Sequence, residues 1–125
     1  MASELRVNTL KDAAGANSVA LSTVANGSAK HFVWFDGNTS NTIQASFNNS
    51  SVTDNGTGDY SPVLTNAMSS TFSILTAMSY RTSRYTCTGS GVSMSSTSGY
   101  DLDCTNSSTT FTDTEIGSQL DGDLA

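Results

Sequence analysis

The sequence predicts an all-β domain, an antiparallel β-sandwich or barrel of short strands that assembles as a symmetric oligomer. Ser, Thr, Asn and Gly make up 60 of the 125 residues, and all four disfavour helix interiors. Short apolar or alternating segments recur about every ten residues, which is typical of sandwiches and barrels. A 13.0 kDa domain with few large apolar residues has a small core, so we expect partner subunits to cover its exposed strands.

The first three strands are predicted at residues 4–10, 18–21 and 30–36. Residues 4–10 alternate between apolar and polar side chains, and residues 18–21 form a short apolar run. The dipeptide Asn26-Gly27 then predicts a turn, because it readily supplies positive φ. Residues 30–36 are apolar on both faces, which is typical of a strand inside a sandwich or at a subunit interface.

A fourth strand and a hairpin follow. Residues 42–47 alternate cleanly, which predicts that Ile43, Ala45 and Phe47 lie on the buried face. Residues 51–64 predict a hairpin, because two strand-like segments flank a turn rich in Asp, Asn and Gly.

The remaining strands are predicted more weakly. Alternation and β-favouring residues place them at 71–80, 85–88, 92–95, 100–104 and 109–112. In the first of these, one face carries Phe72, Ile74, Thr76 and Met78. The chain is therefore predicted to be a single β domain, 1–125, in which 1–84 is a neutral assembly core and 85–125 is an acidic, Ser/Thr-rich part.

Charge is distributed unevenly and argues against several functions. Residues 1–84 carry five basic and five acidic residues, whereas residues 85–125 carry six acidic residues and no Lys or Arg. A net charge of −6 argues against nucleic-acid binding, which needs clustered Lys and Arg. No run of about 18 apolar residues is present, so we expect no membrane insertion. The N-terminal segment lacks the apolar centre of a signal peptide.

The two cysteines, Cys87 and Cys104, form the one candidate site. Their spacing matches neither a zinc motif nor a C-x-x-C redox motif. A disulfide joining two adjacent strands would stabilise the fold by roughly 3 kcal/mol in the chain-entropy model. Two separate buried thiols are the alternative, and assembly inside a cell would favour thiols at first.

No catalytic, cofactor-binding or metal-binding residue is predicted, so we expect a non-enzymatic protein without cofactors. His31 is the single histidine, and no G-x-S-x-G elbow accompanies it, which favours an ordinary strand residue. Acidic pairs could hold calcium or act in glycoside hydrolysis. These pairs are Asp101/Asp103, Asp113/Glu115 and Asp121/Asp123. No complete calcium loop is present, so solvated or interface acids are the favoured interpretation.

Aromatic residues leave two interpretations open. Stacking on a sugar and packing in the core or between subunits are both compatible with an aromatic side chain. The residues concerned are Trp34, Tyr60, Tyr80, Tyr85 and Tyr100. Packing is favoured for Trp34, which lies in the most apolar strand, while both interpretations stand for Tyr85 and Tyr100.

Four stretches of the sequence carry a resemblance to a known family. They are SELRVNTLKD (3–12), SAKHFVWFDG (28–37) with IQASFN (43–48), SVTDNGTGDY (51–60) with TNAM (65–68), and the terminal GDLA. In these stretches the chain resembles short structural proteins, often described as tail fibre proteins, of tailed phages that infect marine bacteria and cyanobacteria. The resemblance covers residues 3–78 and the extreme end. The polar, acidic segment 109–120 departs from the apolar last strand that is usual in such proteins.

The resemblance implies a non-enzymatic virion structural protein, a tail fibre or spike component that acts in assembly or host-surface attachment. We expect it in the virion, after assembly in the host cytoplasm. The expected partners are further copies of the chain, as a homo-oligomer and specifically a trimer, together with other virion proteins and a host-surface glycan. A head decoration (cement) protein on the capsid surface is one alternative, favoured by the short length. A carbohydrate-binding module is the other.

Overall fold

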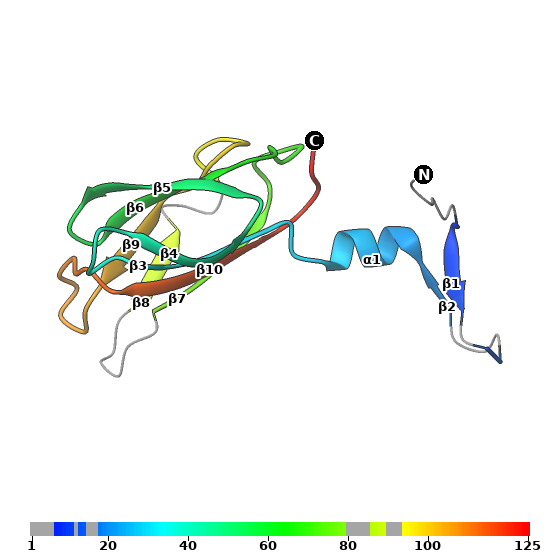
Figure 1. The fold of residues 1–125 in the computed structure, drawn as a ribbon, viewed down its shortest axis with the longest axis horizontal. Coiled ribbons are helices and arrows are strands. Elements are labelled where there is room, and N and C mark those ends of the chain that lie inside the picture. The colour runs from blue at the N-terminus through cyan, green and yellow to red at the C-terminus, as the bar shows by residue number, and fades with distance from the viewer. Residues whose placement is uncertain (1–6, 12, 15–17, 80–85, 90–93) are drawn as a thin grey trace.

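The computed structural model describes residues 7–11, 13–14, 18–79, 86–89 and 94–125, and Figure 1 shows their arrangement. Within these residues the chain forms ten strands and one short helix. Their bounds are β1 Thr9–Lys11, β2 Ser18–Ala20, α1 Leu21–Gly27, β3 His31–Asp36, β4 Thr42–Phe47, β5 Asn49–Gly56, β6 Asp59–Leu64, β7 Ile74–Ser79, β8 Thr86–Gly89, β9 Leu102–Thr105 and β10 Glu115–Asp121.

Every pairing between these strands is antiparallel, and three sheets result. Their strand orders are β1-β2, β4-β3-β10-β7 and β5-β6-β9-β8. The predicted all-β, antiparallel class is therefore confirmed, and the described strands form no closed barrel. The predicted hairpin at 51–64 is present as β5 and β6.

The two four-stranded sheets lie against each other and share one core, and together they form the body of the molecule, residues 31–125 (Figure 1). β3 and β10 supply one side of the core, and β6 and β9 supply the other. Its buried apolar residues are Val33, Phe35, Tyr60, Leu64, Met68, Met94, Tyr100, Leu102, Cys104, Ile116 and Leu120. Both 1–84 and 85–125 thus contribute strands to the same two sheets, while the division of roles between them stays a prediction.

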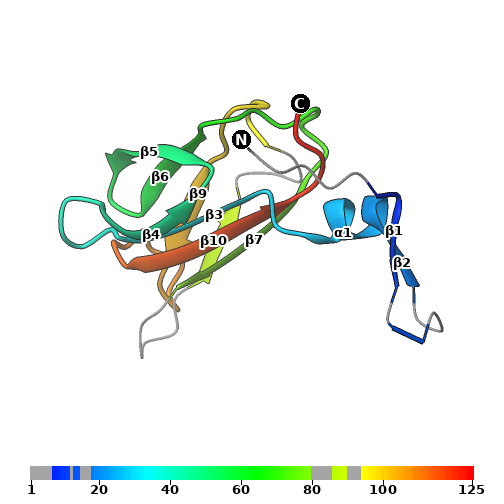
Figure 2. The ribbon, with the colours of Figure 1, turned by 45° about the vertical axis from the view of Figure 1, so that its right-hand side comes forward.

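The third sheet and the helix form an arm, residues 7–28, that projects from the body (Figures 1 and 2). β1 pairs with β2 over three residues each, and α1 follows β2 directly. The N–H of Leu21 donates a hydrogen bond to the carbonyl of Asn8, which ties the start of α1 to the hairpin. The sequence predicted a strand to residue 21 and then a turn. A helix forms because this segment lies beside no further strand, and a helix satisfies its backbone groups internally.

Two predictions about strands are wrong. Residues 42–47 do form β4, but all six residues are exposed, including Ile43, Ala45 and Phe47. β4 is the edge strand of its sheet, and the β3–β4 register shifts between Trp34 and Phe35, so clean alternation does not bring these side chains into the core.

The predicted strand at 109–112 is also wrong, because the last strand is β10, Glu115–Asp121, which lies between β3 and β7. Residues 92 and 93 of the strand predicted at 92–95 lie outside the described residues, and Met94 is in no strand. Residues 4–6 of the first predicted strand also lie outside them.

Candidate binding face

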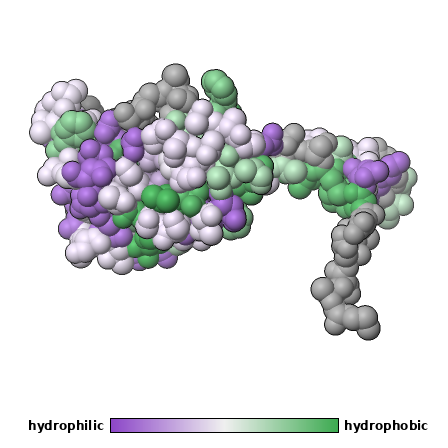
Figure 3. Space-filling model, turned by 90° about the horizontal axis from the view of Figure 1, so that it is seen from above, coloured by the Kyte–Doolittle hydropathy of each residue, from purple (hydrophilic) through white to green (hydrophobic). Residues whose placement is uncertain are grey.

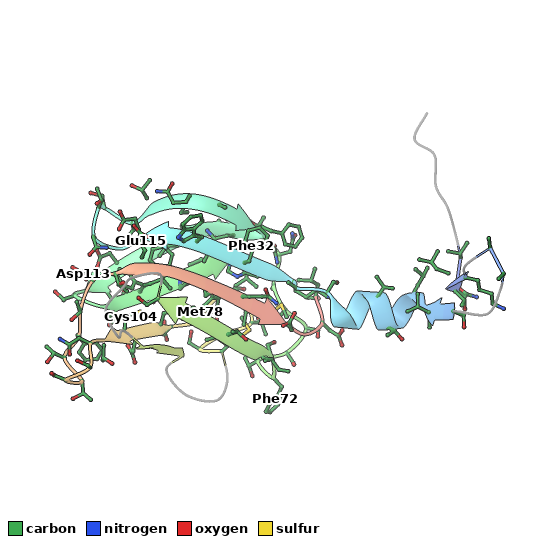
Figure 4. All side chains as sticks on the ribbon, turned by 90° about the horizontal axis from the view of Figure 1, so that it is seen from below. Phe32, Phe72, Met78, Cys104, Asp113 and Glu115 are labelled. Carbon is green, nitrogen blue, oxygen red and sulfur yellow. The ribbon has the colours of Figure 1, made fainter. Side chains whose placement is uncertain are left out.

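One face of the body carries large apolar side chains that point away from the core. It is the outer face of the β4-β3-β10-β7 sheet, seen in Figure 4, and we call it the outer face. Because side chains alternate along a strand, His31, Val33 and Phe35 of β3 are buried, whereas Phe32 and Trp34 are exposed. The same alternation exposes Ile74, Thr76 and Met78 of β7. Of the four residues predicted to share one face, Ile74, Thr76 and Met78 do so in β7, while Phe72 lies outside that strand.

A groove runs across the outer face at Gly117. In the sheet register, Gly117 of β10 lies between Trp34 of β3 and Met78 of β7. Nothing lies within 4 Å of the position that a Cβ at Gly117 would occupy, so the glycine leaves a gap between two large neighbours. The groove has a volume of about 580 Å³, and its lining includes Phe32, Trp34, Met78, Gly117 and Gln119.

Exposed aromatic and aliphatic side chains border this groove. The rings of Phe32 and Phe47 stack with centroids 6.2 Å apart, and Trp34 is 41% exposed. Ile74 is 70% exposed and Met78 is 69% exposed. At about 200 Å² for each large side chain, these five residues expose roughly 500 Å² of mainly apolar surface. A patch of this size is at the upper end of what monomers carry, and patches of this size are often functional.

Carboxylates stand at both ends of the outer face. Asp36 of β3 pairs in register with Glu115 of β10, on the same side of the sheet as Trp34 and Gly117. At the other end, Asp121 pairs in register with Ile74. One member of each of the acidic pairs Asp113/Glu115 and Asp121/Asp123 thus lies on the outer face. A basic or dipolar group at either end of the groove would be attracted to these carboxylates.

The opposite face of the body, formed by the β5-β6-β9-β8 sheet, is polar and acidic. Asp59 and Asp103 are cross-strand neighbours, and Ser61 Oγ donates a 2.7 Å hydrogen bond to Asp101 Oδ1. Burial and the charges of Asp59 and Asp101 raise the pKa of Asp103.

Seen from the β5–β6 side, weakly polar residues cover most of the body, and strongly hydrophilic ones gather at the end away from the arm (Figure 3). Among the described residues, no group of three or more His, Cys, Asp and Glu could hold a metal ion.

His31 sits in a buried chain of hydrogen bonds that joins the two sheets. Its Nδ1 lies 3.3 Å from the hydroxyl of Tyr100, and that hydroxyl lies 2.7 Å from Ser118 Oγ. On the other side, His31 Nε2 lies 3.1 Å from Asn49 Oδ1. His31 is 0% exposed, and its burial lowers its pKa, so the ring is neutral at pH 7. Ser118 and Tyr100 are buried as well, so these hydrogen bonds have a structural role in the core.

Asp113 holds a turn against the core. Its Oδ1 accepts hydrogen bonds of 2.8 Å from the hydroxyl of Tyr60 and 2.8 Å from the N–H of Gly58. The Tyr60 hydroxyl also lies 3.3 Å from the carbonyl oxygen of Gly37. Burial, with the hydrogen bond to Asp113 and its charge, raises the pKa of Tyr60. Tyr60 and Tyr100 are therefore packing residues with satisfied hydroxyls.

The burial of the aromatic residues distinguishes sugar stacking from packing for some of them. Tyr100 is buried and cannot present a platform for a sugar, whereas Trp34 is exposed beside the groove. Tyr80 and Tyr85 lie outside the described residues. The sequence signal for the outer face was the strand with apolar residues on both faces. It missed Gly117, whose neighbours come from segments far apart in the chain.

The β8–β9 register pairs Cys87 with Cys104. Cys104 is buried and disulfide-bonded. Cys87 is the other cysteine of the chain, and its side chain lies outside the described part of the structure. Paired residues in an antiparallel ladder have Cα atoms about 4.5–5.5 Å apart, within the span that a disulfide allows. The predicted Cys87–Cys104 pairing is thus the arrangement that this register favours.

Comparisons with protein-family models, curated proteins and solved structures find no match. In the part of the chain that the structure describes, α1 with its seven residues is the one helix, and it is too short to span a bilayer.

Proposed function

We propose that the chain is a non-enzymatic structural protein of a phage virion, a component of a tail fibre or spike that acts in assembly or host-surface attachment. In this proposal the body is a β-sandwich, and symmetric copies of the chain, as a trimer, form the working unit. The observation that supports it best is the arm, which the body of its own chain does not cover. The resemblance of residues 3–12 and 28–37 to tail fibre proteins supports the virion location.

The arm is too small to be stable on its own. A two-stranded hairpin is marginal in water, and so is a helix of seven residues. Its apolar side chains find little cover within the chain, since Leu10, Val19 and Val24 are all at least 36% exposed. A segment of this kind gains stability when it packs against another molecule, as subunits of a particle do.

Native mass spectrometry of the full chain at micromolar concentration tests the assembly. The proposal expects a discrete oligomer, a trimer being the expected species, and a dominant monomer would contradict it. Cryo-microscopy of purified virions then tests the location. Density for the body on the tail supports a tail fibre or spike, whereas density on the capsid surface would replace it with the head decoration alternative.

A carbohydrate-binding module is the second candidate, and the exposure of Trp34 beside the open position at Gly117 favours it. An indole next to a gap is a surface on which a sugar ring can stack. A glycan array with the Trp34→Ala variant as control tests this function. Binding that disappears in the variant supports it, and an array without binding removes it.

A further inference from the structure

The molecule has two apolar surfaces that its own chain leaves exposed, and they differ in shape. The outer face carries a groove with a gap at Gly117. The arm is narrow and projecting, with Leu10 and Val19 paired across its hairpin and Val24 on α1. We infer that the arm of one copy packs into the outer-face groove of a second copy. This inference rests on the proposed function, because it names the contact through which the copies assemble.

The linker between α1 and β3 directs the arm away from its own groove. Lys30 Nζ donates hydrogen bonds to the carbonyls of Ala25 and Ser28, the latter at 2.8 Å. The backbone N–H of Lys30 donates to the carbonyl of Leu120 at 2.8 Å, which fixes the same residue to the body. In Figures 1 and 2 the arm extends beyond the end of the body at which β3 begins. The arm is thus presented to a neighbour.

The groove has room for the side chains of the arm. An apolar cavity of about 150 Å³ is enough to hold a benzene molecule. A groove of about 580 Å³ therefore accepts several aliphatic side chains. With Phe72, which lies at the edge of the face in Figure 4 and is 88% exposed, the apolar surface rises to roughly 700 Å². This approaches the roughly 800 Å² that each partner buries in a standard interface.

Charge favours an arm on a groove over two outer faces packed together. The arm, residues 7–28, carries one basic and one acidic residue, whereas residues 31–125 carry two basic and nine acidic residues. Packing two bodies face to face would bring together the carboxylates of Asp36, Glu115 and Asp121 from both copies. An arm brings the exposed Lys11 toward them instead. In this contact each copy contributes its arm to one neighbour and its groove to another.

Such a contact joins two different surfaces, so it is heterologous. A heterologous contact gives a ring when its rotation closes and an open filament when it does not. A closed trimer follows when each arm reaches the next copy around a threefold axis. The arm-exchange contact therefore supplies a physical route to the symmetric oligomer proposed above.

A photo-crosslinking experiment tests the contact directly. The full chain carries p-benzoylphenylalanine in place of Val24, and equal amounts of ¹⁴N- and ¹⁵N-labelled protein are mixed and irradiated. We expect crosslinks from the benzophenone at position 24 of one copy to the peptide that contains Met78 of a copy with the other label. Crosslinks confined to one copy, or joining arm to arm, would overturn the inference even if the protein is oligomeric.

A pair of substitutions at Gly117 gives an independent test. Gly117→Leu fills the gap, and Gly117→Ser is the matched control that leaves most of it open; neither meets an atom within 4 Å at Cβ. We expect Gly117→Leu to raise the dissociation constant of the oligomer at least tenfold, with an unchanged circular dichroism spectrum, and Gly117→Ser to change it little. Equal dissociation constants for both variants and the unsubstituted chain would overturn the arm contact while leaving assembly intact. A monomer in the unsubstituted protein would overturn the contact and the proposed function together.

Discussion

Replacing Tyr100 with Phe removes a single oxygen atom from the middle of the core. That oxygen lies 2.7 Å from Ser118 Oγ and 3.3 Å from His31 Nδ1, and Tyr100 is 1% exposed. The ring remains, so the apolar packing changes little. The cost arises because the two buried partners lose a hydrogen-bonding group that water cannot replace. His31 keeps its contact with Asn49, so the main loss falls on Ser118.

The magnitude follows from the cost of leaving a buried polar group unsatisfied, which is about 1–3 kcal/mol. We expect Tyr100→Phe to lower the free energy of unfolding by about 2 kcal/mol. Urea denaturation followed by fluorescence and circular dichroism at pH 8 and fixed protein concentration measures it. Ser118→Ala removes the other partner, so the double variant should lose about 1 kcal/mol less than the sum of the single variants. Strict additivity, or a loss below 0.5 kcal/mol for Tyr100→Phe, would refute this account of the buried chain.

Three further predictions concern ionisable and sulfur groups. Burial lowers the pKa of His31, so the unfolded chain binds a proton more readily, and the free energy of unfolding should fall below about pH 6.5; His31→Gln should abolish that part of the pH profile in denaturant titrations. Asp103→Asn should raise the melting temperature slightly because it relieves repulsion from neighbouring carboxylates, whereas the control Asp123→Asn should not. A reducing agent should lower the free energy of unfolding by roughly 3 kcal/mol, and a Cys87→Ala variant that still responds to the reductant would contradict the Cys87–Cys104 pairing.

The strands predicted best are those whose signal is local. β3 was predicted from a run of apolar residues and the β5–β6 hairpin from a turn of Asp, Asn and Gly, and both lie close to the predicted ranges 30–36 and 51–64. β10 was missed because its sequence is polar. Its buried positions are Ile116, Ser118 and Leu120, and Ser118 is accommodated by the hydroxyl of Tyr100, which a local pattern cannot reveal.

The outer face could be predicted only in part, for a related reason. The sequence indicated that the strand at 30–36 is apolar on both faces and that one face of 71–80 is apolar. It could not indicate that Gly117 lies between them, because that depends on the registers of β10 with β3 and with β7. The burial predicted for β4 failed for the same kind of reason, since edge position and register shift are tertiary properties.

Two of the six acidic residues in 85–125 are explained by alternation around a central strand. In β9 and the residue before it, Leu102 and Cys104 point into the core, while Asp101 and Asp103 lie on the face opposite the groove. Carboxylates on that face are best left in water, since a neighbouring copy placed there would desolvate them. One face of the body thus favours association and the other opposes it. A two-faced body of this kind can assemble in few ways, and an arm that reaches the apolar face satisfies both constraints without stacking acidic surfaces.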